Sequence, residues 1–114
     1  MADMSISQSA GTDGTVHLAL AGEIDMASSS TLAAALRAAI CADDTKQVAV
    51  DLGQVTFLDS SGMRELVLAH ALAAERAVSF YIINAHERPR RVLELTGLLA
   101  ILTEQAPPDA ATTA

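Results

Sequence analysis

Four consecutive residues, Asp59-Ser-Ser-Gly62, bring a carboxylate, two hydroxyls and a glycine together where an apolar segment gives way to a helical pattern. Serine and aspartate at such a place typically cap the helix, and local chemistry alone favours this role. The same place also suits a phosphate on serine, because free N–H groups and the helix dipole stabilise an anion there. A phosphate would add about −1.5 to −2 charges and repel a docked partner, while Gly62 would let another chain's backbone approach closely.

Patterns that mark an enzyme are missing. Neither Ser60 nor Ser61 has glycines both two residues before and two residues after it, as a hydrolase nucleophile requires, and Lys46 does not belong to a Walker phosphate loop. The three histidines show no pair at metal-ligand spacing. Glu23, Asp25 and Asp59 could form an acid/base set, but acidic residues at strand ends are more often caps or solvated charges. We therefore expect a protein that is not an enzyme and that uses no metal and no cofactor.

Composition limits the class of protein further. The chain has 114 residues, of which 51% are apolar and 18% charged, as expected of one globular domain. Fourteen acidic residues against seven basic ones give a net charge of −7, which argues against nucleic acid as a partner. The only cysteine is Cys41, which suits a reducing compartment. With no basic leader and no apolar run of about 18 residues, we expect a cytoplasmic protein without a membrane partner.

The first part of the chain predicts a hairpin and a helix. Residues 4–9 and 15–21 alternate polar and apolar side chains on either side of a turn-rich insert, residues 11–14. In residues 28–40, a serine cluster is followed by leucine or isoleucine at every fourth position. This spacing predicts an amphipathic helix with its capping residues in front.

The middle of the chain predicts a parallel crossover. Residues 47–52 form an apolar run that is typical of a strand buried on both faces, and Gly53-Gln54 is expected to break it. Residues 55–58 lead into the serine corner, and a helical stretch continues to about Arg76. Residues 78–83 form the next strand. A strand, a helix and a strand in this order indicate parallel pairing.

The fold class follows from this alternation. A helix opening near Pro89 continues through Thr96, and Gly97 provides its stop. We expect one α/β domain over residues 1–103, with helices packed on a mixed, mostly parallel sheet of four to five strands. Residues 104–114 are expected to form a disordered tail. Sites in such sheets lie at the carboxyl ends of strands, which points to Asp25 and to the serine corner.

The helix after Ser61 has two distinct faces when residues are placed 100° apart. The more apolar face contains Met63, Leu66, Val67, His70, Ala71 and Ala74. The opposite face is mixed and contains Arg64, Glu65, Leu68, Leu72, Glu75 and Arg76. Two leucines framed by charges fit either a helix packed on both sides or an exposed contact patch with a polar rim.

Taken together, four stretches of the chain resemble the bacterial anti-sigma factor antagonists of the STAS superfamily. The resemblance covers about residues 4–103. Its most specific part is the Asp-Ser-Ser-Gly element at a strand-to-helix corner. The stretches are Gly22–Asp25, Val48–Asp51, Val55–Gly62 and Arg91–Leu98.

This resemblance implies a partner-switching protein. In its unphosphorylated form it would bind an anti-sigma factor that is also a serine kinase of the histidine-kinase-like ATPase type, and so free a sigma factor for transcription. A serine phosphatase would reverse the modification. The family's phosphate acceptor matches Ser61, with Ser60 as runner-up, and Asp25 and Asp59 match acidic positions bordering the site. Gly62 belongs to the same motif. Apart from the resemblance, the mixed face of the following helix adds Arg64, Leu68 and Leu72 as expected partner contacts.

The sequence also allows other functions. A non-switching STAS module that senses a small ligand or scaffolds a stress-signalling complex is the main alternative. A receiver domain is disfavoured, because the chain lacks its acidic pair after the first strand and its late lysine. Many antagonists close with an amphipathic helix after the last strand. Here residues 101–104 run directly into a segment with Pro107-Pro108, so we expect that helix to be missing.

Overall fold

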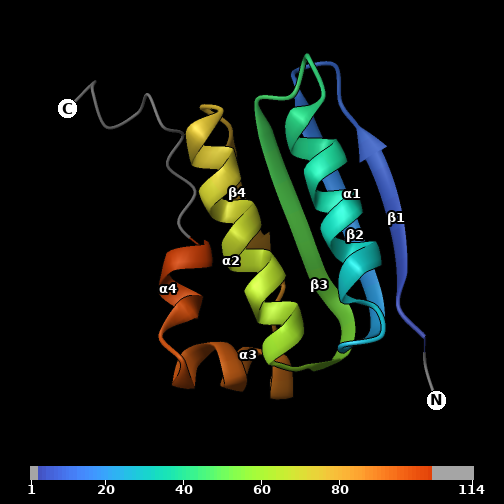
Figure 1. Cartoon of the computed structure of the whole chain (residues 1–114), viewed down its shortest axis with the longest axis vertical. Helices are drawn as coiled ribbons and strands as arrows, with labels where there is room; N and C mark the ends of the chain where they lie inside the picture. Colours follow the sequence, from blue (N-terminus) through green and yellow to red (C-terminus); the bar gives the residue numbers. More distant parts are fainter. Residues whose placement is uncertain (1–2, 104–114) are drawn as a thin grey trace.

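A four-stranded mixed sheet forms the centre of the structure, a computed structural model that describes residues 3–103 (Figure 1). The first two strands pair antiparallel, and the remaining pairs are parallel. The predicted mixed, mostly parallel sheet is therefore confirmed, with four strands. In spatial order they are β1 (Ser5–Ala10), β2 (Thr15–Ile24), β3 (Gln47–Leu58) and β4 (Ser79–Ile83).

Two long helices lie side by side across one face of this sheet and run in the same direction (Figure 1). They are α1 (Ser29–Cys41), which connects β2 to β3, and α2 (Ser60–Glu75), which connects β3 to β4. Two shorter helices follow the last strand, α3 (Glu87–Leu95) and α4 (Leu98–Thr103). The α/β alternation expected from the sequence is confirmed.

The core lies between the sheet and the two long helices, and it is almost entirely aliphatic. Alternate residues of β2 and β3 point to this side because side chains on a strand alternate between its faces. Full burial of each such side chain stabilises the fold by about 1.5–3 kcal/mol. The buried strand residues include Val16, Leu18, Leu20, Val48, Val50 and Leu52.

Strand β3 is continuous through the glycine that was expected to end it. Ala19 pairs with Asp51, whereas Ala21 pairs with Gln54, so β3 contains one extra residue between these two pairs. The Asp51 carboxylate accepts a hydrogen bond of 2.8 Å from the backbone N–H of Gly53 and supports the irregularity. The predicted break is therefore wrong, because Gly53 allows a bulge after which the pairing resumes.

Two helices follow the last strand: α3, which confirms the helix predicted near Pro89, and α4, which was not expected. Gly97 adopts a φ of 78° and ends α3, and the apolar residues after it fold back as α4. Leu102 is fully buried, and Leu98 and Leu99 pack against the core, with α4 contacting β4 and α2. The terminal helix predicted to be missing is thus present with six residues. The predicted disordered tail, residues 104–114, lies outside the described residues.

Candidate functional site

The start of α2 is capped by Asp59. Its backbone is extended, with φ −106° and ψ −174°, as is usual for a residue just before a helix. Its Oδ1 accepts hydrogen bonds from the backbone N–H of Ser61 at 2.9 Å and of Gly62 at 3.2 Å. The Asp59 N–H donates to the carbonyl of Ile24 at 3.2 Å. The carboxylate therefore caps the helix, and its backbone is fixed to the end of β2.

The two serine hydroxyls are not used for capping. Ser60 is the first residue of α2 and is exposed, while Ser61 is the second and is half-buried. Within residues 3–103, neither hydroxyl has a hydrogen-bond partner. Both oxygens are therefore free of competing bonds that would reduce their availability to an electrophile.

The environment offered to a phosphate differs from the sequence-based expectation. That expectation relied on free N–H groups at the helix start, but the amides of Ser61 and Gly62 are both bound by Asp59. Aspartate is itself an anion at the positive end of the helix dipole. Two of the N–H groups expected to be free are therefore satisfied by a side chain of the same corner, while no partner is described for the N–H of Ser60.

Gly62 is buried and is required by the packing of α2 on its own sheet. A Cβ at this position would lie 2.6 Å from Ile24 Cγ2 and 2.7 Å from Leu58 Cδ1, distances that real Cβ atoms do not reach. From the sequence, this glycine was expected to let the backbone of another chain approach closely. In the structure the lack of a side chain instead allows α2 to sit close to β2 and β3.

Asp25 closes the turn between β2 and α1. Its Oδ1 accepts a hydrogen bond of 3.1 Å from the Ser28 N–H, and the Ser28 Oγ accepts one of 3.0 Å from the Asp25 N–H. Ser28 was recognised from the sequence only as part of a serine cluster. The Asp-x-x-Ser spacing, which resembles a reciprocal capping box, was the signal that could have identified it.

The structure brings the predicted acidic residues and serines to one edge of the sheet. Asp25 follows β2 and Asp59 follows β3, and these strands are parallel neighbours. The hydrogen bond from Asp59 to Ile24, the residue before Asp25, joins the two strand ends directly. The rule that sites form at the carboxyl ends of parallel strands thus places these residues correctly.

The two leucines predicted as partner contacts have different environments. Leu68 is 48% exposed, whereas Leu72 is half-buried and packs against the core. Both line a narrow groove of about 70 Å³ between α1 and α2, together with Arg37 and Glu65. Arg64 is exposed one turn before Leu68. Of the two open interpretations, an exposed patch fits Leu68 and a packed helix fits Leu72.

The buried face of α2 differs from the predicted apolar face. Leu66 is buried as predicted, but Val67, Ala71 and Ala74 are exposed. The helix packs through small residues because these let it approach the sheet and α1 closely, which a ranking by hydrophobicity does not detect. Its buried residues are Gly62, Leu66, Ala69 and Ala73.

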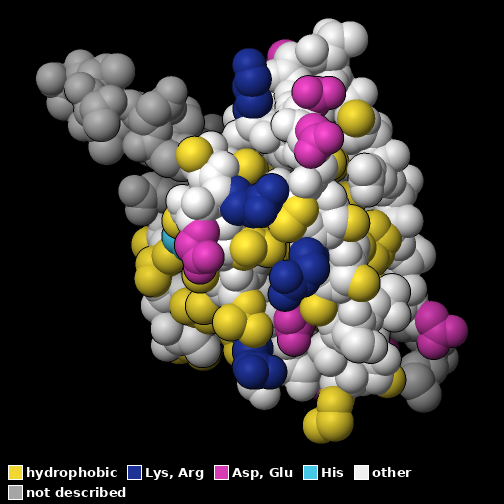
Figure 2. Space-filling model, turned by 45° about the horizontal axis from the view of Figure 1, so that its top comes forward, with side chains coloured by type: hydrophobic (Ala, Val, Ile, Leu, Met, Phe, Trp, Pro, Cys, Tyr) yellow, Lys and Arg dark blue, Asp and Glu magenta, His cyan; other side chains and the backbone are white. Residues whose placement is uncertain are grey.

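Apolar side chains surround the serine corner on the surface. Met26 directly follows Asp25 and is 77% exposed, and Leu95 at the end of α3 is 76% exposed. The neighbouring Thr96 hydroxyl lies 3.9 Å from the sulfur of Met63 in the first turn of α2. Figure 2, in which this end of the molecule is turned away from the viewer, shows hydrophobic side chains interspersed with arginine and acidic ones over the face that carries α1 and α2. Nothing in the sequence pattern separates such exposed residues from core residues.

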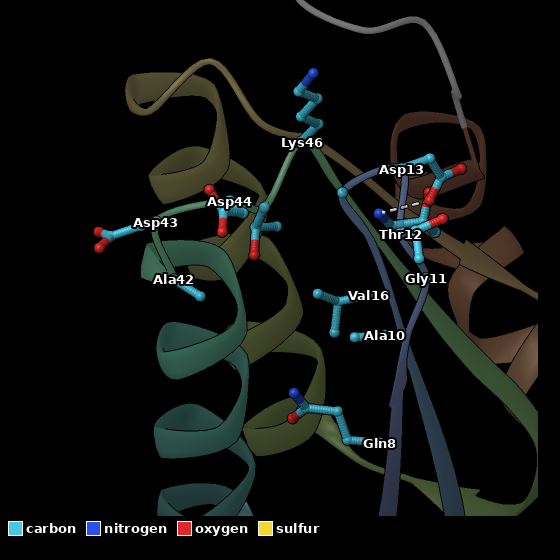
Figure 3. A pocket seen from close by; sticks show the side chains of 13 residues that line it. Gln8, Ala10, Gly11, Thr12, Asp13, Val16, Ala42, Asp43, Asp44 and Lys46 are labelled. Atoms are coloured by element: carbon cyan, nitrogen blue, oxygen red, sulfur yellow. Dashed lines mark hydrogen bonds between the residues drawn. The ribbon is translucent and has the colours of Figure 1, made fainter.

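A cavity of about 740 Å³ lies at the opposite end of β3, between the β1–β2 hairpin and the loop before β3 (Figure 3). Asp13, Asp43, Asp44 and Lys46 line it, and none of them was predicted to be functional. In residues 3–103, no group of three or more His, Cys, Asp or Glu side chains is arranged to hold a metal ion. No helix in this part of the chain is long and apolar enough to cross a bilayer.

Comparisons with known proteins agree with this geometry. A crystal structure of an anti-sigma factor antagonist from Mycobacterium paratuberculosis is 26% identical, with a TM-score of 0.78 over 97% of this chain and 93% of that one. The anti-sigma factor antagonist SpoIIAA in its unphosphorylated form is 21% identical, with a TM-score of 0.76 over 95% and 93%. The phosphorylated Bacillus SpoIIAA is 21% identical, with a TM-score of 0.69 over 96% and 97%.

At these identities the two SpoIIAA structures establish likeness of fold alone. The family model is more direct, because the model of the STAS domain matches residues 7–110, which is most of the chain. The matched segment includes most of β1, the other three strands, both long helices and the serine corner. This chain is a member of the STAS domain family.

Proposed function

We propose that this protein is a phosphorylation-controlled anti-sigma factor antagonist. In this proposal the unphosphorylated chain binds an anti-sigma factor that is also a serine kinase of the histidine-kinase-like ATPase type, and frees a sigma factor. The observation that carries the proposal is Ser61, whose hydroxyl has no internal partner among the described residues and lies at a helix start bordered by Asp25 and Asp59. The similarity to the mycobacterial antagonist supports it.

The chemistry of the switch would be supplied by the partner. The Ser61 oxygen attacks the γ-phosphorus of ATP held by the kinase, the hydroxyl proton passes to a base of the kinase, and ADP leaves. A serine phosphatase would later hydrolyse the phosphate ester with water. The protein itself acts as substrate and binding partner, not as an enzyme, and we place this exchange in the cytoplasm.

Charge explains how the modification would release the partner. A phosphate adds about −1.5 to −2 charges at pH 7 to a corner that already carries two carboxylates. Repulsion of this kind at an interface weakens binding and slows association. Exposed Met26 and Leu68 would provide apolar contact area near the switch, and Arg64 a charged rim.

The test is incubation of the purified protein with its kinase and ATP, followed by phosphopeptide mapping. We expect label on Ser61, its loss in Ser61→Ala, and its retention in the matched control Ser60→Ala. Label on Ser60 alone would transfer the acceptor role to the runner-up. The absence of label in all three proteins would favour a non-switching STAS module that senses a ligand or acts as a scaffold.

A binding assay tests whether a negative charge at position 61 weakens binding to the anti-sigma factor. Ser61→Asp is expected to weaken binding to the anti-sigma factor while the fold is maintained, and Ser61→Ala is expected to bind as the wild type does. Equal binding of Ser61→Asp and Ser61→Ala would rule out electrostatic control at this position. A pull-down with and without phosphatase treatment would identify the partner.

A further inference from the structure

No partner is described for the Ser60 N–H, but the two amides that follow it in the first turn of α2, those of Ser61 and Gly62, are already occupied by Asp59. Its Oδ1 accepts from the N–H groups of Ser61 and Gly62, both in the first turn of α2 where the helix dipole favours an anion. We propose that Asp59 excludes the phosphate of phosphorylated Ser61 from the helix start and keeps it on the protein surface. This inference rests on the proposed function, since it concerns the modified state of the same serine.

The backbone on both sides of the serines cannot rearrange to accommodate both anions. The Asp59 N–H is bound to the Ile24 carbonyl, and Gly62 is packed against the side chains of Ile24 and Leu58. The carboxylate and the phosphate must therefore compete by side-chain rotation alone. Only one of them can accept from the two amides at a time.

The balance of this competition favours the carboxylate. Displacing Asp59 gains no hydrogen bond in total, because two amide bonds to the carboxylate are replaced by two to the phosphate. The exchange also withdraws a doubly charged group from water and leaves the displaced carboxylate beside it, with Asp25 in the adjoining turn. A phosphate that stays outside keeps its hydration.

An outward phosphate has one cation close along the helix. Arg64 lies three residues after Ser61, on the same side of α2, and is exposed. Its guanidinium forms no ion pair with any residue between 3 and 103. The phosphate would therefore modify the surface that a partner meets, and the fold would gain nothing from it.

The experiment places phosphoserine at position 61 during translation, so no kinase is needed. The phosphorylated and unphosphorylated forms are compared in the wild type, in Asp59→Asn, which keeps the cap without its charge, and in Asp59→Ala, which frees the two amides. The readouts are the amide proton shifts of Ser61 and Gly62 by NMR, and the melting temperature. Phosphoserine at Ser7, on the distant exposed strand β1, controls for the general effect of added charge.

We expect phosphorylation to leave the Gly62 amide shift nearly unchanged in the wild type and in Asp59→Asn, and the melting temperature unchanged or lower. In Asp59→Ala both amide protons should shift downfield and the melting temperature should rise by about 2–4 °C, since the phosphate now caps the helix. If Asp59→Ala does not fold, Asp59→Gly, which is better tolerated at an N-cap, takes its place.

Two results would overturn the inference. An equal downfield shift in the wild type and in Asp59→Ala would show that the phosphate displaces the carboxylate. No shift in any variant would show that the phosphate does not reach these amides, so that Asp59 is not what excludes it. Because the phosphate is installed without a kinase, a kinase that labels neither Ser60 nor Ser61 would refute the proposed function and leave this outcome unaffected.

Discussion

A Cβ at Gly62 would lie 2.6 Å from Ile24 Cγ2, so α2 can pack this closely on β2 only because residue 62 has no side chain. Gly62→Ala must push the first turn of α2 away from the sheet. We expect the free energy of unfolding to fall by about 1–3 kcal/mol, the usual cost of overpacking a core. Urea denaturation measures this change.

The matched control is Ser60→Ala, a substitution at an exposed position of the same helical turn. It should change the free energy of unfolding by less than about 0.5 kcal/mol, as surface substitutions usually do. If Gly62→Ala is as neutral as Ser60→Ala, the start of α2 is looser than the structure describes. The rigidity assigned to the serine corner would then be incorrect.

Substitutions of Leu68 and of Leu72 should affect different properties, partner binding for Leu68 and stability for Leu72. Leu72→Ala removes a side chain packed on the core and should lower the free energy of unfolding by about 1–2 kcal/mol. Leu68→Ala removes an exposed side chain and should leave stability within about 0.5 kcal/mol, while weakening partner binding by about tenfold where it is an anchor. Thermal denaturation and calorimetric titration measure the two effects. Normal binding by Leu68→Ala would move the docking surface away from the groove.

Asp51 should contribute to stability through the bulge in β3 more than through its ion pair. Its Oδ1 accepts from Gly53 N–H, whereas its Oδ2 lies 3.5 Å from Nε2 of a half-exposed His17. We expect Asp51→Ala to cost about 1–2 kcal/mol, Asp51→Asn to cost less because its amide oxygen replaces the acceptor, and His17→Ala to cost at most about 0.5 kcal/mol. Equal losses for Asp51→Ala and His17→Ala would assign the effect to the ion pair.

The turn of the β1–β2 hairpin should make a small contribution to the free energy of unfolding, and this contribution should depend on pH. The backbone N–H of Thr15, and then its hydroxyl, hold the pKa of Asp13 below its ordinary value. A lowered pKa in the folded state means that the stabilisation is present above the ordinary aspartate pKa and is lost as the pH falls below it. Asp13→Asn should therefore reduce the fall in unfolding free energy between about pH 7 and about pH 3. If the unfolding free energy of Asp13→Asn falls as much as that of the wild type over this pH range, other carboxylates account for the whole pH dependence.

The sequence predicted the elements that carry strong periodic or turn signals. The hairpin around Gly14, the helix after the serine cluster and the parallel crossover all agree with the structure. Gly53 was misjudged because a glycine that ends a strand and one that forms a bulge look alike until the neighbouring strand is in place. The terminal helix was misjudged because a six-residue helix such as α4 depends on tertiary packing, which outweighs its weak local signal.

The site was predictable in position but not in its bonding. Strand ends in a parallel sheet meet at one edge, so Asp25 and Asp59 could be placed together from the sequence alone. Which atom caps α2 depends on side-chain rotation, and Asp59, Ser60 and Ser61 are all residue types that cap helices well. Only the coordinates distinguish the carboxylate that binds the amides from the hydroxyls that do not.

The parallel arrangement of α1 and α2 halves the negative charge of the unmodified corner. Both helices begin at the same edge of the sheet, so their positive ends lie together, and each is met by one carboxylate. The two helix ends of about +0.5 each offset about half of the two carboxylates, which leaves a local charge of about −1. On a chain with a net charge of −7, one more anion would otherwise be a small change. At this corner a phosphate of about −1.5 to −2 charges changes the local charge to about −2.5 to −3, so the modification more than doubles it.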